Sequence, residues 1–165
     1  MFERYSEVAR GAIFFARMEA GEAGATSVDT EHLLMGILAV DPELSTQLGI
    51  ELDLTSFRNR SKQSHPSQPG VAFTIDMPIE LELGKTLERA MSIAAVHKCR
   101  EVRTEHLVAS LLEQGGHVAD CLRGFGLEEK AMTILLTKID CNKPQMPTEA
   151  TRDAMRTVLQ SKMFS

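Results

Sequence analysis

The stretch VDTEHLLMGIL at residues 28–38 recurs as VRTEHLVASLL at residues 102–112. The letters TEHL are identical in the two copies, and the shift from Thr30 to Thr104 is 74 residues. A four-residue identity alone can arise by chance. The same shift, however, aligns apolar and small residues on both sides of the motif, namely Ile13 with Leu87, Ala16 with Ala90, Ala20 with Ala94 and Leu38 with Leu112. Such a collinear set of matches indicates an internal duplication.

Each copy has the residue spacing of successive helices. In the first copy, apolar residues recur at intervals of three and four from Tyr5 to Ala23, which predicts one long helix. Gly24 then allows the chain to leave that helix. Thr30 is predicted to cap the next helix with its hydroxyl, and Glu31 lies in the first turn, where the helix dipole favours an anion.

Two shorter helices complete the first copy. Asp41 and the proline after it predict the start of a third helix ending near Gly49, and Asp53 is predicted to cap a fourth helix running towards Lys62. The second copy repeats this plan, with Thr104 as a cap. The sequence therefore predicts an all-α domain over residues 1–140, with four-helix repeats at about residues 5–62 and 79–140.

The segments outside the repeats have a different composition. Residues 63–78 are predicted to link the repeats, and the alternation of Val71, Phe73 and Ile75 indicates a partly extended segment. Residues 141–165 are predicted to form a C-terminal tail with an extra helix that begins at Thr148.

Composition restricts the class of protein. The chain has 165 residues, 43% of them hydrophobic, and a net charge of −5, so nucleic acid is an unsuitable main ligand. The N-terminus lacks an apolar signal core, and no apolar run reaches membrane length. Three cysteines without a CxxC pair favour reduced thiols. We therefore expect a soluble, cytoplasmic protein that binds neither membranes nor nucleic acid.

The quoted motifs resemble those of a known family. A helix that opens with YSEVA at residues 5–9, followed by the doubled TEHL motif, resembles the N-terminal domain of Clp-family AAA+ unfoldases over about residues 3–140. The resemblance implies an eight-helix, pseudo-twofold domain that recruits substrates or adaptor proteins to a Clp protease. The chain contains no GxxxxGK[ST] phosphate loop. We therefore expect a non-enzymatic module without a cofactor, in a stand-alone protein rather than in a fragment of an unfoldase.

The resemblance also indicates candidate ligand-binding residues. In the ClpC branch of the family, the glutamates that match Glu31 and Glu105 help to bind phosphoarginine, and a carboxylate can accept a guanidinium in bidentate fashion. Ser6 supplies a hydroxyl that we assign to the first site with Glu31, whereas Glu80 at the matching place in the second would repel a phosphate. Alternatively, each glutamate only complements a helix dipole.

Two further sets of residues are candidate sites. His32 and His106 each follow a glutamate, but neighbouring side chains on a helix point about 100° apart, so we expect hydrogen bonding within each repeat and no metal site. Phe14, Phe15 and Met18 could form a surface for a partner helix or an unfolded segment. Packing of these three side chains against the other repeat or the linker is the alternative that we favour.

The sequence is also compatible with two other function classes. A hydrolase or metal enzyme could use Glu31, His32, Glu105 and His106, although no GxSxG, HExxH or Cys-His signature supports it. A dimerising helical scaffold is the third class. The leading prediction is an interaction module whose partners are a Clp unfoldase or protease, adaptor proteins or unfolded clients.

Overall fold

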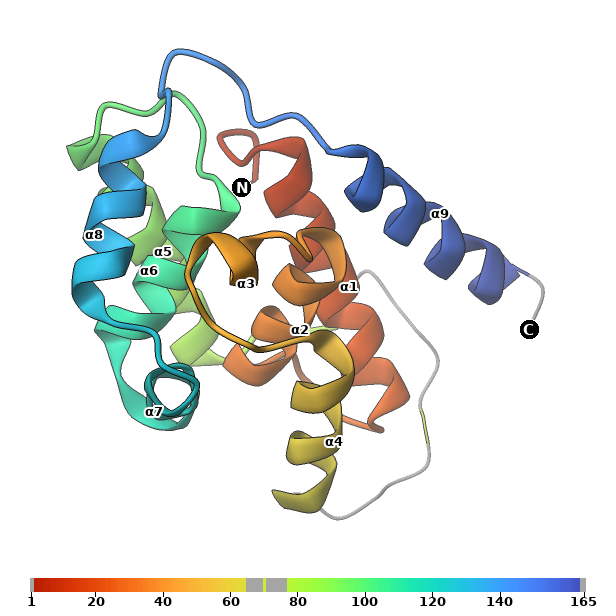
Figure 1. Ribbon diagram of the computed structural model, residues 1–165. Coiled ribbons are helices and arrows are strands. Elements are labelled where there is room, and N and C mark those ends of the chain that lie inside the picture. Colours follow the sequence, from red (N-terminus) through yellow and green to blue (C-terminus); the bar gives the residue numbers. More distant parts are fainter. Residues whose placement is uncertain (1, 65–69, 71–76, 164–165) are drawn as a thin grey trace.

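The computed structural model describes residues 2–64, 70 and 77–163, and within them the chain forms nine helices (Figure 1). This confirms the all-α prediction, including the extra C-terminal helix. Val71, Phe73 and Ile75 lie outside the described residues. The helices are α1 (Glu7–Glu22), α2 (Thr30–Val40), α3 (Leu44–Gln47), α4 (Leu54–Ser64), α5 (Leu81–Val96), α6 (Thr104–Gln114), α7 (Gly116–Gly124), α8 (Glu129–Lys138) and α9 (Glu149–Met163).

Two short parallel bridges show how the repeats are joined. Tyr5 pairs with Val102, and Val28 pairs with Ile79. The shift of 74 residues converts one pair into the other, since it relates Tyr5 to Ile79 and Val28 to Val102. The backbone hydrogen bonds are 2.8 and 2.9 Å long in both bridges. Each repeat therefore uses its entry segment to hold the segment before the second helix of the other repeat, as a twofold relation requires.

The histidines of the TEHL motifs hold the starts of α2 and α6. Asp29 Oδ1 accepts a hydrogen bond from His32 N at 3.0 Å, and His32 Nδ1 accepts one from Asp29 N at 3.1 Å. In the second repeat His106 Nδ1 accepts from Arg103 N at 2.8 Å. The cap is thus Asp29 or Arg103, and the prediction that the threonine after each would be the cap is wrong. The prediction missed that a histidine two residues after the threonine can reach back to the capping backbone.

The third and fourth helices of repeat one differ in how well the sequence predicts their starts. Asp53 Oδ1 accepts from Ser56 N at 2.7 Å at the start of α4, which confirms its capping role. The prediction that Asp41 starts the third helix is wrong, because α3 begins at Leu44 with Glu43 as the residue before it. Between Asp41 and Leu44 the backbone forms a turn, in which Leu44 N donates to Asp41 O at 3.1 Å.

The first two helices of repeat one pack at unusually short range. A Cβ atom added to Gly36 would lie 2.0 Å from the carbonyl oxygen of Ala12 and 2.9 Å from the backbone nitrogen of Ala16. In repeat two, Ser110 occupies the position that matches Gly36, and its hydroxyl donates to the carbonyl oxygen of Thr86 at 2.6 Å. Glycine therefore permits direct backbone contact in repeat one, whereas a buried hydroxyl fills the same crossing in repeat two.

The C-terminal tail lies across both repeats. A disulfide joins Cys99 to Cys141, with the two Cα atoms 4.3 Å apart, and Cys121 is the free, buried cysteine among the described residues. The prediction of three reduced thiols is therefore wrong for two of them, because residues 42 positions apart in the sequence meet where the tail leaves α8. Beyond this bond α9 packs along α2 and beside α1, where Met155 lies over Gly11 (Figure 1).

Candidate functional site

Glu31 lies at the junction of the two repeats. The residue is 8% exposed, and its two oxygens face different helices. Oε2 accepts a hydrogen bond from the Ser61 hydroxyl of α4 at 2.7 Å, and Oε1 lies 3.1 Å from His117 Nε2 at the start of α7. The carboxylate, in the first turn of α2, therefore connects its own helix to α4 and α7.

A pocket of about 230 Å³ opens beside His117, the residue that contacts Glu31. It lies between the start of α2 and the turn from α6 to α7. Gly115 and Gly116 form that turn with φ of 77° and 83°, a conformation that favours glycine, and they leave the pocket floor without side chains. The start of α7 has no side-chain cap, so its amide N–H groups are suited to an acceptor on a ligand. The pocket is lined by Thr30, Glu82, Leu111, Gln114, Gly115, Gly116, His117 and Val118.

Glu105 has different surroundings. It is 5% exposed, and its Oε2 accepts from Arg103 Nε at 3.1 Å. Nearby, Asp41 accepts from the Thr104 hydroxyl at 2.9 Å. Burial raises the pKa of Asp41, and the charge of Glu105 raises it further. The second glutamate thus already holds a guanidinium from its own chain.

Ser6 belongs with the second glutamate's helix. The Ser6 hydroxyl caps α1 by accepting from Ala9 N at 3.0 Å and donates to Gln145 Oε1 at 2.8 Å. The same Gln145 oxygen accepts from Thr104 N at 3.2 Å, and Gln145 Nε2 donates to the Thr104 hydroxyl at 2.8 Å. The side chain of Gln145, 8% exposed, therefore fills the space between the starts of α1 and α6.

The pairing of Ser6 with Glu31 in one site is corrected by this geometry. Because the bridges cross between repeats, the residue before α1 lies against repeat two, and the residue before α5 lies against repeat one. Glu80, which matches Ser6, accepts accordingly from the Ser27 hydroxyl, ahead of α2, at 2.9 Å. A pocket stays open between Thr30 at the start of α2 and His117, whereas the space at the start of α6 is filled by Gln145 of the tail. Sequence comparison of the repeats could not show this, since Gln145 lies outside both.

The proposed partner surface on α1 is not formed. Phe15 and Met18 are 3% and 5% exposed and lie in the hydrophobic core, and Phe14 is partly buried against it. The rings of Phe14 and Phe15 meet edge to face with centroids 5.5 Å apart. The three side chains pack within the domain, because α1 is buried on most of its circumference. Packing against the other repeat or the linker, the alternative that we favour from the sequence, stays a prediction.

The histidines serve the fold. His32 and His106 are 7% and 0% exposed and make the helix-start contacts described above. Burial, followed by the charges of Arg103 and His97, lowers the pKa of His106 to about 4. Across the described part of the chain, no three or more His, Cys, Asp or Glu side chains gather in a way that could hold a metal ion.

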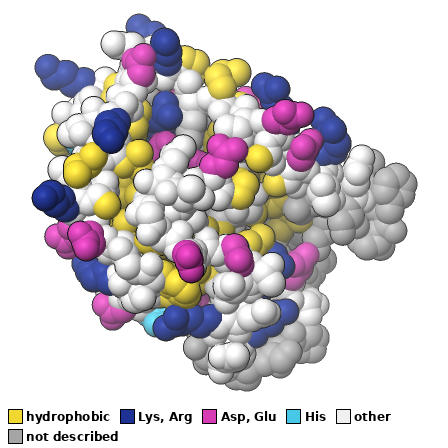
Figure 2. Space-filling model, in the orientation of Figure 1, with side chains coloured by type: hydrophobic (Ala, Val, Ile, Leu, Met, Phe, Trp, Pro, Cys, Tyr) yellow, Lys and Arg dark blue, Asp and Glu magenta, His cyan; other side chains and the backbone are white. Residues whose placement is uncertain are grey.

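Surface charge shows no dominant basic region on the face seen in Figure 2, where acidic and basic side chains alternate around small apolar patches. None of the helices in the described residues is long and apolar enough to cross a membrane.

The geometry above agrees with comparisons to known proteins. Residues 4–125, about three quarters of the chain, match the Clp repeat (R) N-terminal domain. The chain is 27% identical over 145 residues to the chloroplastic chaperone protein ClpD of Arabidopsis thaliana, which covers 81% of this chain and 15% of that protein. It is 31% identical over 130 residues to an ATP-dependent Clp protease ATP-binding subunit ClpA homolog of Cyanidium caldarium, covering 78% of this chain and 15% of that protein.

Solved structures have the same fold. The N-terminal domain of the caseinolytic protease associated chaperone ClpD from Arabidopsis thaliana superposes with a TM-score of 0.68 at 26% identity, covering 96% of this chain and 99% of that one. The Hsp104 N-terminal domain from Candida albicans shares the fold, with a TM-score of 0.66 at 15% identity over 90% of this chain and 99% of that one. The chain spans about 15% of the length of the curated relatives named here. With its doubled motif, crossed bridges and matching fold, this chain belongs to the Clp repeat N-terminal domain family.

Proposed function

We propose that this domain docks client or adaptor proteins for a Clp-type ATP-dependent unfoldase or protease. The relatives' names describe chaperones and ATP-binding subunits of Clp protease, and this chain matches only a small part of their length. The observation that carries the proposal is the open pocket that Thr30 of α2 and His117 of α7 line between the two repeats. A volume of about 230 Å³ is below the range typical of small-molecule sites and suits one or two side chains of a bound protein.

The pocket offers both kinds of hydrogen-bonding group. The uncapped amide N–H groups of α7 can bind a carbonyl, while Glu82, whose Oε2 accepts from Gln114 Nε2 at 2.8 Å, can accept from a further donor. Leu111 and Val118 supply an apolar wall. Such a mixture suits a peptide segment, which presents a backbone carbonyl, an N–H group and an apolar side chain together.

A capture experiment with a pocket-filling variant tests this function. The full chain carries a photo-cross-linker at Gln114, and captured proteins are identified by mass spectrometry in cells of the source organism. We expect Clp unfoldase or protease subunits, their adaptors or their clients. Thr30→Arg, which places a long side chain in the pocket, should abolish capture, whereas Thr133→Arg on exposed α8 should not. Equal capture by both variants would contradict the proposal.

Phosphoarginine is a narrower ligand class for the same pocket. The start of α7 offers amides for a phosphate, and Glu31 lies behind His117 as an acceptor for the guanidinium. Glu82 in the pocket wall opposes a phosphate. Isothermal titration with a phosphoarginine peptide tests this alternative, because the absence of heat with both the wild type and Glu31→Ala would exclude it.

A cytoplasmic location is part of the same proposal. It no longer rests on the thiols, since two of them form a disulfide. Three relatives are chloroplastic by name, so fractionation of the source cells is the measurement that decides the compartment.

A further inference from the structure

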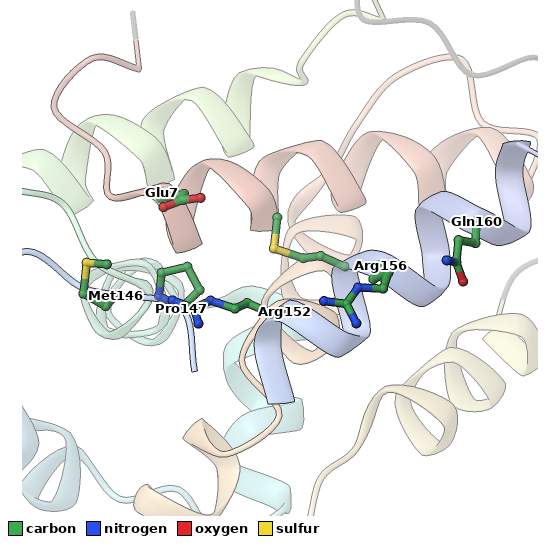
Figure 3. Close-up of a pocket in the computed structure, with 7 residues that line it drawn as sticks. Glu7, Met146, Pro147, Arg152, Arg156 and Gln160 are labelled. Carbon is green, nitrogen blue, oxygen red and sulfur yellow. The ribbon is translucent and has the colours of Figure 1, made fainter. Parts of the chain in front are cut away.

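A second cavity lies between the start of α1 and α9, on the C-terminal tail that follows the two repeats. It measures about 390 Å³, within the range of ligand-binding pockets. Figure 3 shows Arg152, Arg156 and Gln160 reaching it from α9, with Glu7 on α1 across from them and Met146 and Pro147 closing one end. We refer to these six residues and Met155 as the tail groove.

The inner wall of the tail groove is apolar and adaptable. Met155 is partly buried over α1, where its Cε atom would lie 3.4 Å from a Cβ on Gly11. Met146 is 62% exposed at the groove end, so its apolar side chain is accessible to a ligand in the groove. Unbranched thioether side chains adjust to different apolar shapes and are frequent on protein-binding surfaces.

The outer rim of the tail groove is cationic. Arg152 and Arg156 are one helical turn apart, so both lie on the same face of α9. Both are exposed, and the nearest carboxylate to Arg156 among the described ion pairs is Asp153 at 3.7 Å on the same helix. A pair of guanidiniums with a weak internal partner, in a chain of net charge −5, is complementary to a carboxylate on a ligand.

We propose that the tail groove binds a short peptide segment of a partner protein in which an acidic side chain neighbours an apolar one. The acidic side chain is held by Arg152 and Arg156, and the apolar one contacts Met146 and Met155. Glu7 faces the arginines and accepts from a backbone N–H of the peptide. This site is separate from the pocket beside His117, so its existence does not depend on the function proposed for that pocket.

Fluorescence anisotropy on the full chain tests the proposal. The probe is a short fluorescein-labelled peptide in which leucine alternates with glutamate. We expect Arg152→Glu with Arg156→Glu to raise Kd at least tenfold. Gln160→Glu, a single change on the same rim, should raise Kd in the same direction by a smaller factor. The matched control, Lys130→Glu with Lys138→Glu on exposed α8, makes the same change in net charge and should leave Kd unchanged.

Two further probes separate the proposed ligand from other occupants. A peptide with lysine in place of glutamate should not bind, and neither should a single-stranded oligonucleotide. Equal loss of binding in both double variants, or tighter binding of the oligonucleotide, would overturn the proposal. Sedimentation velocity tests whether a second copy of this chain occupies the groove. The peptide proposal would also be overturned if the wild type self-associates without binding the peptide and only the Arg152 and Arg156 double variant abolishes that self-association. Circular dichroism confirms that each variant is folded.

Discussion

Replacing Gly36 with alanine should strongly destabilise this domain, although alanine is the better helix former. The residue lies within α2 at its crossing with α1. The added Cβ would stand 2.0 Å from the carbonyl oxygen of Ala12, and its other two nearest atoms also belong to the α1 backbone. No side chain can rotate away to relieve this contact, so the two helices must separate.

The size of the effect follows from the geometry. An ordinary contact begins at 3.4 Å, so the helices must move apart by about 1.4 Å at this point. Overpacking of a core costs about 1–3 kcal/mol, and a clash with rigid backbone belongs at the upper end of that range. The intrinsic preference of a helix for alanine over glycine returns about 1 kcal/mol. We therefore expect a net loss of about 2 kcal/mol in the free energy of unfolding, or about 4–8 °C in Tm for a chain of this size.

Urea unfolding followed by circular dichroism at the helical band measures this loss. The chain offers a matched control in Gly84, an interior residue of α5 where an added Cβ would meet no atom within 4 Å. Gly84→Ala should therefore raise the free energy of unfolding by up to about 1 kcal/mol. The two substitutions are chemically identical and should differ in sign. A Gly36→Ala protein as stable as the wild type would refute the packing argument.

Three other changes test the tail and the buried histidine. Cys141→Ser should lower the free energy of unfolding by about 4 kcal/mol, because the unfolded chain gains entropy when the disulfide no longer closes the loop between residues 42 positions apart. In the wild type, thiol labelling of the unreduced, denatured chain should detect Cys121 alone, and three labelled thiols would contradict the disulfide. Gln145→Ala should cost about 2 kcal/mol in urea unfolding, because Thr104 N–H loses its acceptor, and no change would show that the tail does not fill this space. The pKa of His106 is about 4 in the folded chain, against 6.5 in the unfolded chain, because burial disfavours the charged ring. The free energy of unfolding should therefore be highest above pH 6.5 and fall by up to about 3 kcal/mol as the pH drops towards 4. A His106→Gln variant whose unfolding free energy shows the same pH profile would refute this.

Much of the fold follows from local pattern. The periodicity of apolar residues predicts α1 and α2, and the shift of 74 residues between Thr30 and Thr104 predicts the second repeat. Helix contacts recur every three or four residues, so the information lies within a short window of sequence. The same signal predicts the extra helix α9.

The candidate site depends on contacts that no local pattern contains. Ser6 meets Gln145, which is 139 residues away, and Cys99 meets Cys141. The spacing of a duplicated sequence predicts where the two copies lie in the chain. It does not predict which copy each connecting segment packs against. The apolar residues Tyr5 and Ile79 ahead of each first helix were the available signal for the crossed bridges. The burial of Phe15 could not be predicted either, because the apolar residues along one face of α1 do not show how many other elements pack around that helix.

The duplicated halves have diverged in a way that bears on binding. Where repeat one has Gly36, repeat two has Ser110 and a hydroxyl bond across the crossing. Where the start of α2 faces repeat two, a pocket remains beside His117, whereas the matching start of α6 is contacted by Gln145 from the tail. A twofold domain with two equal sites would bind two ligand segments alike. Here the tail removes one of the equivalent sites and, through α9, adds the tail groove on another face. We therefore expect binding to be divided between one inter-repeat pocket and one tail-dependent groove, so that deleting residues 141–165 should abolish peptide binding in the groove while leaving the pocket beside His117 in place.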